Sequence, residues 1–123
     1  MNALSFLDSF RIVDLSASRF RVAGYVTLDV VHRDGRVEDK WLGLLPREFA
    51  LLWRLAEEPG WPVSDGDLAV AMGYSSRESG HKWLLQCASE LERKLAGLGV
   101  VGLVEAHRDG GYVLVPPKGL PLI

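Results

Sequence analysis

The sequence has little cysteine and no long apolar run. Cys87 is the one cysteine among 123 residues, so an internal disulfide and a zinc site made of several cysteines are both excluded. No stretch approaches the roughly 20 apolar residues that a membrane-spanning helix requires, and the N-terminus lacks the basic segment and apolar run of an export signal. We therefore expect a cytoplasmic chain without a membrane partner, with Cys87 as a buried helix thiol in preference to a redox sensor.

An excess of positive charge is also missing. The chain carries 14 Lys and Arg against 16 Asp and Glu, which is a formal net charge of -2 at pH 7. Proteins that bind duplex nucleic acid gain most of their affinity from neutralised phosphates, so the charge balance alone does not indicate such a partner. In contrast, 48% hydrophobic residues and four tryptophans argue against disorder. One folded domain over residues 1–123 is expected.

Residues 44–98 carry the signals of three helices. The first should begin at Pro46, because a proline at the first helical position loses no hydrogen bond. Apolar side chains then recur at helical spacing until Pro59-Gly60 stops the run. These side chains are Phe49, Leu52, Trp53 and Ala56.

The second helix should be short and begin after a cap. Ser64 with Asp67 three residues later resembles a capping box in which Asp replaces Glu. Val63 before the cap and Leu68 after it are placed to form a hydrophobic staple. The helix should end near Gly73, because glycine is typical of a helix C-terminus.

A third helix and a hairpin should follow. The helix should begin between residues 76 and 80 and continue to about residue 97, because an apolar stripe of 3.6-residue period runs through it. The stripe consists of Leu84, Cys87 or Ala88, Leu91 and Leu95. Residues 100–106 and 112–115 are β-prone, and residues 108–111 between them tolerate the positive φ of a tight turn.

The N-terminal third is β-prone, and three or four antiparallel strands are expected there. The candidate strands are residues 10–15, 19–24, 25–31 and 36–42. Asp34-Gly35 should supply a hairpin turn, whereas residues 1–9 have no assignment. The expected organisation is therefore an N-terminal sheet over 1–43, a three-helix core over 44–98, a hairpin over 99–117 and a tail over 118–123.

Four motifs in this order resemble the winged-helix effector domain of OmpR/PhoB-type response regulators. They are Leu45-Pro46-Arg47-Glu48-Phe49-Ala50-Leu51-Leu52, Pro62-Val63-Ser64, Leu91-Glu92-Arg93-Lys94-Leu95 and Arg108-Asp109-Gly110-Gly111-Tyr112. The resemblance extends from Trp41 to Pro116. It implies an α+β winged helix-turn-helix with an N-terminal antiparallel sheet, three helices and a C-terminal β-hairpin wing. It also implies DNA binding, with the third helix in the major groove and the wing in the minor groove.

The resemblance assigns DNA contacts to the third helix and the wing. Lys82 keeps the basic character that the family has near the start of that helix, where the helix dipole also favours phosphate. Arg108 matches the family's wing arginine, although a solvated turn residue is an equal alternative. The full set of candidate DNA-binding residues is Arg77, His81, Lys82, Trp83, Gln86, Ser89 and Arg108.

Two carboxylates count against this site. Glu90 and Glu92 occupy positions where the family has basic residues, and carboxylates repel a phosphate backbone, although one could accept from a cytosine amino group. The acidic helix face favours an alternative in which it binds a basic protein partner, such as RNA polymerase or another regulator. Arg93 and Lys94 are expected to complement the C-terminal end of the helix dipole in preference to binding DNA.

No catalytic residue, metal site or cofactor is expected. His-Arg-Asp-Gly occurs at 32–35 and at 107–110 and shares a phrase with kinase catalytic loops, but both copies lie at expected hairpin turns in a chain too short for a kinase. The three histidines share no metal-like spacing. The tryptophans at 41, 53 and 61 are expected in the core, with Trp83 as the exception near the helix face.

The sequence therefore supports two functions, neither of them enzymatic. The first is a transcription regulator that binds double-stranded DNA, as paired copies or a homodimer, through the third helix and the wing. No receiver domain is expected ahead of the winged helix, so phosphorylation of the chain's own receiver should not control it. The second is a protein-interaction module that has lost DNA binding. A fold alone does not decide between them.

Overall fold

A computed structural model of the chain describes residues 19–74 and 77–116, with side chains in the second range from Lys82 onward. The strand expected over 10–15, the tail over 118–123 and the side chains of Arg77 and His81 lie outside this description. The domain boundaries above remain predictions. Within the described residues, no helix is long and apolar enough to cross a membrane.

The N-terminal sheet has four antiparallel strands in sequence order. They are β1 (Phe20–Ala23), β2 (Val26–Asp29), β3 (Asp34–Val37) and β4 (Lys40–Trp41). The expected strands over 19–24 and 25–31 are thus confirmed in shortened form. The strand expected over 36–42 is interrupted by a turn at 38–39, where Glu38 has a φ of 58°.

The expected hairpin turn at Asp34-Gly35 is wrong, because both residues belong to β3. Gly35 is instead required by packing: a Cβ there would lie 2.9 Å from the Val26 side chain and 3.1 Å from that of Leu28. The Asp34 carboxylate accepts hydrogen bonds from the backbone N–H groups of Gly43 (3.1 Å) and Leu44 (3.0 Å). It therefore fixes the connection that leads from the sheet into the first helix.

The three expected helices are present. They are α2 (Pro46–Leu55), α3 (Asp65–Ala71) and α4 (Arg77–Gly97). Ser64 caps α3 as expected, since its Oγ accepts from the backbone N–H of Asp67 at 3.1 Å. The C-terminal hairpin consists of β5 (Val104–Ala106) and β6 (Tyr112–Leu114). β5 is shorter than expected, and the backbone ahead of it turns at Gly102, which has a φ of 80°.

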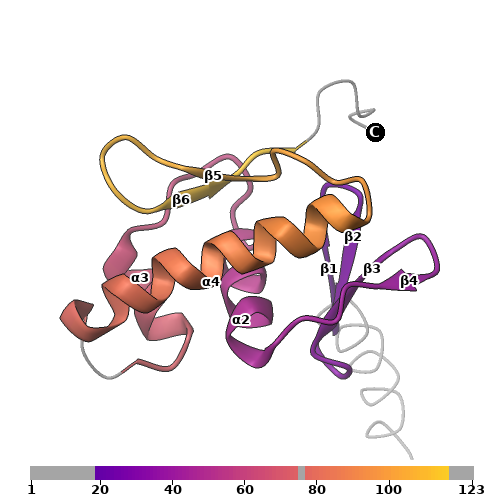
Figure 1. Cartoon of the computed structure of the whole chain (residues 1–123), viewed down its shortest axis with the longest axis horizontal. Coiled ribbons are helices and arrows are strands. Elements are labelled where there is room, and N and C mark those ends of the chain that lie inside the picture. Colours follow the sequence, from indigo (N-terminus) through magenta and orange to yellow (C-terminus); the bar gives the residue numbers. More distant parts are fainter. Residues whose placement is uncertain (1–18, 75–76, 117–123) are drawn as a thin grey trace, which may run out of the picture.

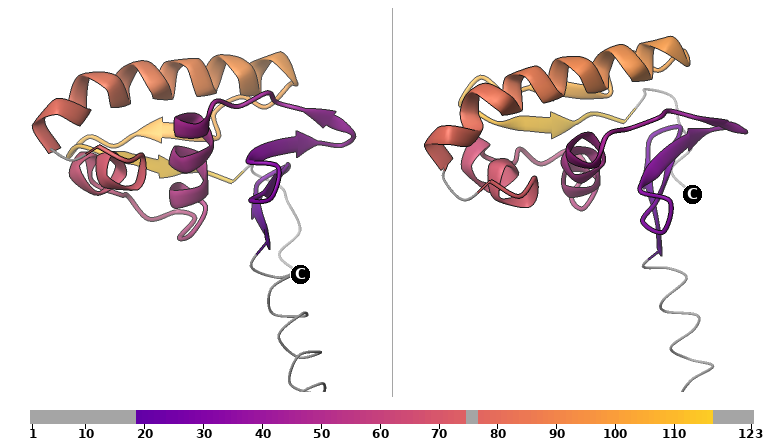
Figure 2. Two further views of the ribbon diagram at one scale, coloured as in Figure 1. Left: turned by 90° about the horizontal axis from the view of Figure 1, so that it is seen from below. Right: turned by 60° about the horizontal axis from the view of Figure 1, so that its bottom comes forward.

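The core lies between these layers (Figure 1, Figure 2). Figure 2 shows α4 as an outer layer, with α2, α3 and the hairpin beneath it and the sheet near its C-terminal end. Each layer contributes aliphatic side chains to one cluster. Its largest fully buried members are Leu28, Leu51, Leu52, Leu55, Leu68, Leu84, Leu91, Leu95, Leu103 and Leu114.

The expectation that tryptophans anchor this core is wrong at two positions. Trp41 is 42% exposed and Trp61 is 68% exposed. Trp53 is partly buried and packs against the core, with the Arg21 guanidinium 4.0 Å from its ring centroid. The aliphatic side chains named above fill the space between the layers, so the larger indole rings lie at its margin.

One buried ion pair connects α2 to α4. Glu48 in the first turn of α2 is buried, and its Oε1 accepts from the backbone N–H of Leu45 at 2.9 Å and from Lys94 Nζ at 2.6 Å. Lys94 Nζ also donates to the Gly43 carbonyl at 3.0 Å. Lys94 was expected to complement the end of its own helix; instead it binds the carboxylate that caps α2.

We expect Lys94→Met to lower the free energy of unfolding by about 3 kcal/mol, because it leaves the Glu48 carboxylate buried without a counter-charge. Urea unfolding measures the change. Adding Glu48→Gln should recover a large part of the loss, since the amide oxygen still accepts from Leu45 N–H and no charge remains. Lys40→Met on β4 is the exposed control. A loss in Lys94→Met no larger than in this control would contradict the prediction.

Candidate nucleic-acid interface

Four polar side chains form a stripe along the outer face of α4. Lys82, Gln86, Ser89 and Arg93 are all exposed. They follow one another at intervals of four, three and four residues, and such positions lie on one face of a helix. Among the side chains of α4 from Lys82 onward, the buried ones are Leu84, Ala88, Leu91 and Leu95. The polar stripe therefore faces directly away from the core.

Glu90 and Glu92, which were expected on the groove face, flank this stripe on opposite sides. Glu90 lines a hollow of about 150 Å³ toward α2, together with Arg47 and Trp83. Glu92 lies toward the hairpin, where it acts on Tyr112: burial first, and then the charges of Asp65 and Glu92, raise the pKa of this tyrosine. Neither carboxylate lies at the centre of the exposed face.

Glu90 is also paired along the helix. Arg93 Nε donates to Glu90 Oε1 at 3.0 Å and its second guanidinium nitrogen donates to Oε2 at 3.1 Å. These hydrogen bonds, followed by the charge of Arg93, lower the pKa of Glu90. An exposed pair of this kind adds little stability, but each charge screens the other. Among the described side chains of α4, Lys82 is left as the cation without a carboxylate partner.

The remaining candidate residues are dispersed. Trp83 is 50% exposed and lines the hollow toward α2 with Leu45 and Tyr74, so it lies beside the stripe. Arg108 is exposed in the turn between β5 and β6. Arg77 begins α4.

The second His-Arg-Asp-Gly copy, at 107–110, forms the hairpin turn as expected. The first copy is split between the turn at 30–33 and strand β3. Within residues 19–74 and 77–116, no three His, Cys, Asp or Glu side chains are grouped as metal ligands would be.

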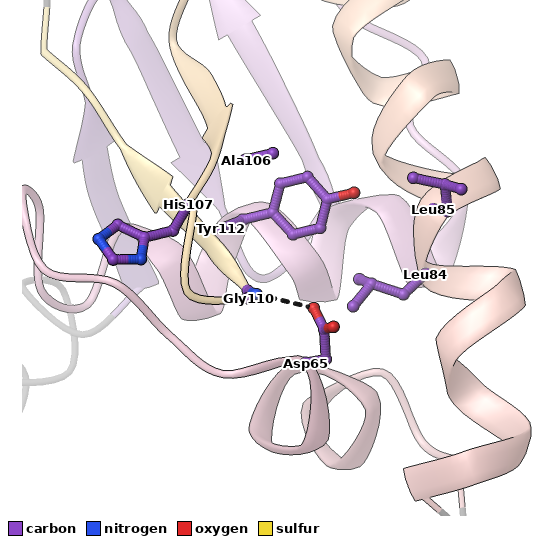
Figure 3. A pocket seen from close by; sticks show the side chains of 8 residues that line it. Asp65, Leu84, Leu85, Ala106, His107, Gly110 and Tyr112 are labelled. Atoms are coloured by element: carbon purple, nitrogen blue, oxygen red, sulfur yellow. Dashed lines mark hydrogen bonds between the residues drawn. The ribbon is translucent and has the colours of Figure 1, made fainter.

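The hairpin is held against the start of α3. Val63 and Tyr112 exchange backbone hydrogen bonds of 2.8 and 3.0 Å, and Asp65 Oδ1 accepts from the Gly111 N–H at 3.0 Å (the dashed line in Figure 3). In Figure 3 the Tyr112 ring projects toward Leu84 and Leu85 of α4 across a hollow of about 160 Å³. The segment at the start of α3 and the Tyr112 side chain together position the wing turn relative to α4.

Gly111 permits this docking. Its φ is 82°, and a Cβ there would overlap the backbone carbonyl of Val63. Gly110 has a similarly positive φ of 97° but open space around it. Of these two glycines, Gly111 alone combines a conformational requirement with a steric one.

We expect Gly111→Ala to lower the free energy of unfolding by about 3 kcal/mol or more, because strain and overlap with Val63 act together. Gly110→Ala should cost about 1 kcal/mol, because it meets only the unfavourable φ. Urea unfolding of both variants measures the difference. Equal losses in the two variants would show that the contact with Val63 does not hold the wing.

Cys87 is half-buried on the α2 side of α4. Burial, and secondarily the negative charge of Glu48, raises the pKa of its thiol to about 11. The thiol is therefore protonated at neutral pH, which is the opposite of what a reactive cysteine requires. This agrees with the expectation of a structural thiol, although Cys87 is less buried than expected.

Comparison with known proteins gives a consistent assignment of the fold. No protein-family model matches the sequence, and no curated protein matches it. The DNA-binding domain of CpxR from E. coli superposes with a TM-score of 0.68 at 24% identity, covering 79% of this chain and 96% of that one. The chain has a winged-helix fold.

Two further solved structures share this fold. The DNA-binding domain of Klebsiella pneumoniae RstA, in complex with the RstA box, has a TM-score of 0.68 at 21% identity, covering 80% of this chain and 99% of that one. The DNA-binding domain of E. coli CadC has a TM-score of 0.65 at 19% identity, covering 80% and 94%. The resemblance to OmpR/PhoB-type effector domains is thus confirmed at the level of the fold.

Proposed function

We propose that this winged helix is a transcription regulator that binds duplex DNA, with α4 in the major groove and the wing in the minor groove. The observation that carries the proposal is the stripe formed by Lys82, Gln86, Ser89 and Arg93, which lies on the outer face of α4, opposite the core. The solved structures of CpxR and RstA are DNA-binding domains, and RstA is in complex with its box. They support this function by analogy of fold.

The dimensions of the stripe suit a groove. Lys82 and Arg93 are eleven positions apart, which is about 17 Å along a helix axis and exceeds the roughly 12 Å width of the major groove. These two cations therefore suit the phosphates on its opposite walls. Gln86 and Ser89 lie between them, where base edges would be; Gln pairs with adenine, and Ser accepts or donates to several bases.

Glu90 reduces the positive charge that this surface offers to DNA. While it holds Arg93, that guanidinium offers less charge to phosphate, and DNA must compete for it. Arg108 in the wing turn supplies a third cation, suited to the minor groove. With about three phosphate contacts, the logarithm of the binding constant should fall with the logarithm of salt concentration with a slope of roughly -3.

A second function, recognition of a protein partner, is favoured by a different surface. The hollow between α2 and α4 exposes Trp83 and Leu45, of which Leu45 is 60% exposed. Glu90 borders it, and Glu92 lies on the other flank of α4. This surface would bind RNA polymerase or another regulator. Such a partner would either replace DNA or bind at the same time as DNA. Pairing of two copies on repeated half-sites remains a prediction.

We expect Lys82→Ala to weaken binding to a labelled mixed-sequence duplex about tenfold at low salt and to reduce the salt slope by about 1, because one phosphate contact is lost. Fluorescence anisotropy measures the binding constant at about 50 and at about 150 mM salt. The two values give the salt slope, because the ionic strengths differ by about threefold. Arg108→Ala should also weaken binding and reduce the salt slope. Lys40→Ala, on the N-terminal sheet, is the matched control. Undetectable binding of the intact chain at low salt would contradict DNA as the partner.

We expect Glu90→Gln to bind the duplex more tightly than the unaltered chain, by a few-fold, and with a steeper salt slope. The amide no longer pairs with the Arg93 charge, so the guanidinium is free for phosphate. Adding Arg93→Ala should abolish the gain. If Glu90→Gln weakens binding, Glu90 itself contacts the bases and the stripe is wrongly assigned.

A further inference from the structure

A hollow of about 260 Å³ opens on the side of α2 that faces the N-terminal sheet. The turn between β2 and β3, helix α2 and the end of α3 line it, and none of the described side chains of α4 does. Phe49, Ala50 and Trp53 of α2 belong to its lining, and we refer to these three residues as its floor. Two arginines, Arg33 and Arg54, also line it. This hollow is therefore separate from the surface proposed to bind DNA.

The floor is an immobilised aromatic surface. The rings of Phe49 and Trp53 stack with centroids 5.4 Å apart. Arg21 holds the indole from the sheet side, because its guanidinium lies over the Trp53 ring and donates to the Trp53 carbonyl at 2.8 Å. Stacked rings held in this way offer a fixed apolar contact at little entropic cost.

Arg54 carries an unsatisfied donor. One terminal nitrogen of its guanidinium is buried and makes no hydrogen bond. The same nitrogen lies 3.4 Å from Glu57 Oε1, close enough for an ion pair but without hydrogen-bond geometry. That nitrogen is closed to solvent, but the Arg54 side chain as a whole is 27% exposed and lines the hollow, so its guanidinium can offer positive charge to an anion there.

Arg33 is held in an uncommon backbone conformation. Its φ is 53°, which non-glycine residues adopt at a cost and which is concentrated at functional sites. Among the described residues, Arg33 has no carboxylate partner.

The turn that carries Arg33 is fixed by the buried Asp29. The Asp29 carboxylate accepts from the Val31 N–H at 2.9 Å and from Arg19 Nε at 3.0 Å, and lies 2.8 Å from His32 Nδ1. The hydrogen bond from Arg19, followed by those from His32 and Val31, lowers the pKa of Asp29. Asp29 therefore stays ionised at neutral pH and holds the turn against the strain at Arg33.

We propose that this hollow binds a small aromatic carboxylate. The ring of the ligand would pack against the exposed part of the floor formed by Phe49 and Trp53, and its carboxylate would accept hydrogen bonds from Arg33 and Arg54. Guanidinium groups match carboxylates in shape and charge. A volume of about 260 Å³ lies just below the roughly 300–1,000 Å³ of pockets for drug-sized ligands, so the ligand is of metabolite size.

The test uses phenylacetate and its neutral isostere phenylacetamide as probes. Each is titrated into the ¹⁵N-labelled full chain, and the indole N–H of Trp53 and the backbone N–H groups of Phe49 and Ala50 are followed by NMR. Phenylacetate should give saturable shifts at these positions with a Kd on the order of 1 mM, as expected for a ligand of this size. Phenylacetamide should bind at least fivefold more weakly.

Variants separate the pocket from unspecific charge. Arg33→Gly removes the guanidinium and also relieves the positive φ, so it should fold at least as stably as the unaltered chain while weakening phenylacetate binding at least fivefold. Arg54→Gln should weaken it similarly. Arg47→Gln is the matched control, because Arg47 lies on α2 but over the Tyr74 ring, beside the other hollow. It should bind as the unaltered chain does.

Three results would overturn the proposal. The first is the absence of shifts at Trp53, Phe49 and Ala50 at 20 mM phenylacetate. The second is equal affinity for the carboxylate and the amide. The third is unchanged binding in Arg33→Gly, which is informative even if Arg54→Gln does not fold.

Discussion

The arrangement of the helices depends on the contact between the Glu48 carboxylate and Lys94 Nζ. Glu48 is buried in the first turn of α2, where it also accepts from the Leu45 N–H, and a buried carboxylate requires a partner. Lys94 lies on one flank of α4 and also binds the Gly43 carbonyl, in the connection that Asp34 fixes to the sheet. The sheet, α2 and α4 are thereby joined in one network. Because that flank is tied down, the rotation of α4 is set and its polar stripe faces outward.

Pairing of carboxylates within the fold explains how a chain of net charge -2 can present basic sites. Four of the described cations are paired with carboxylates: Lys94 with Glu48, Arg19 with Asp29, Arg93 with Glu90 and Arg54 with Glu57. The net charge is therefore a poor guide to local potential. Lys82 on α4, Arg108 in the wing and Arg33 at the β2–β3 turn have no carboxylate partner among the described residues. The first two belong to the proposed DNA surface and the third to the proposed carboxylate pocket.

Much of the fold could be predicted from the sequence because its signals are local. Pro46 at the start of α2, the Ser64 cap of α3 and the apolar period of α4 each act over a few residues. The predictions that were wrong concern residues whose structure depends on distant segments of the chain. Asp34-Gly35 has the composition of a turn, but distant side chains from β2 require Gly35 in a strand. Likewise, the residues next to Trp61 in the chain do not indicate that it is exposed. Its exposure follows from the aliphatic side chains of distant helices and strands, which fill the core.

The pattern of neighbouring residues thus established the order of helices and strands, the winged-helix resemblance and the candidates Lys82, Gln86, Ser89 and Arg108. Contacts between distant segments placed Glu90 and Glu92 beside the stripe, joined Lys94 to Glu48 across 46 positions and Asp65 to Gly111 across another 46, and brought Arg33 and Arg54 to one hollow. The physical reason is that periodicity and capping are intrinsic to a segment. The partner of a buried charge, or the neighbour of a pocket arginine, depends on how all the segments pack.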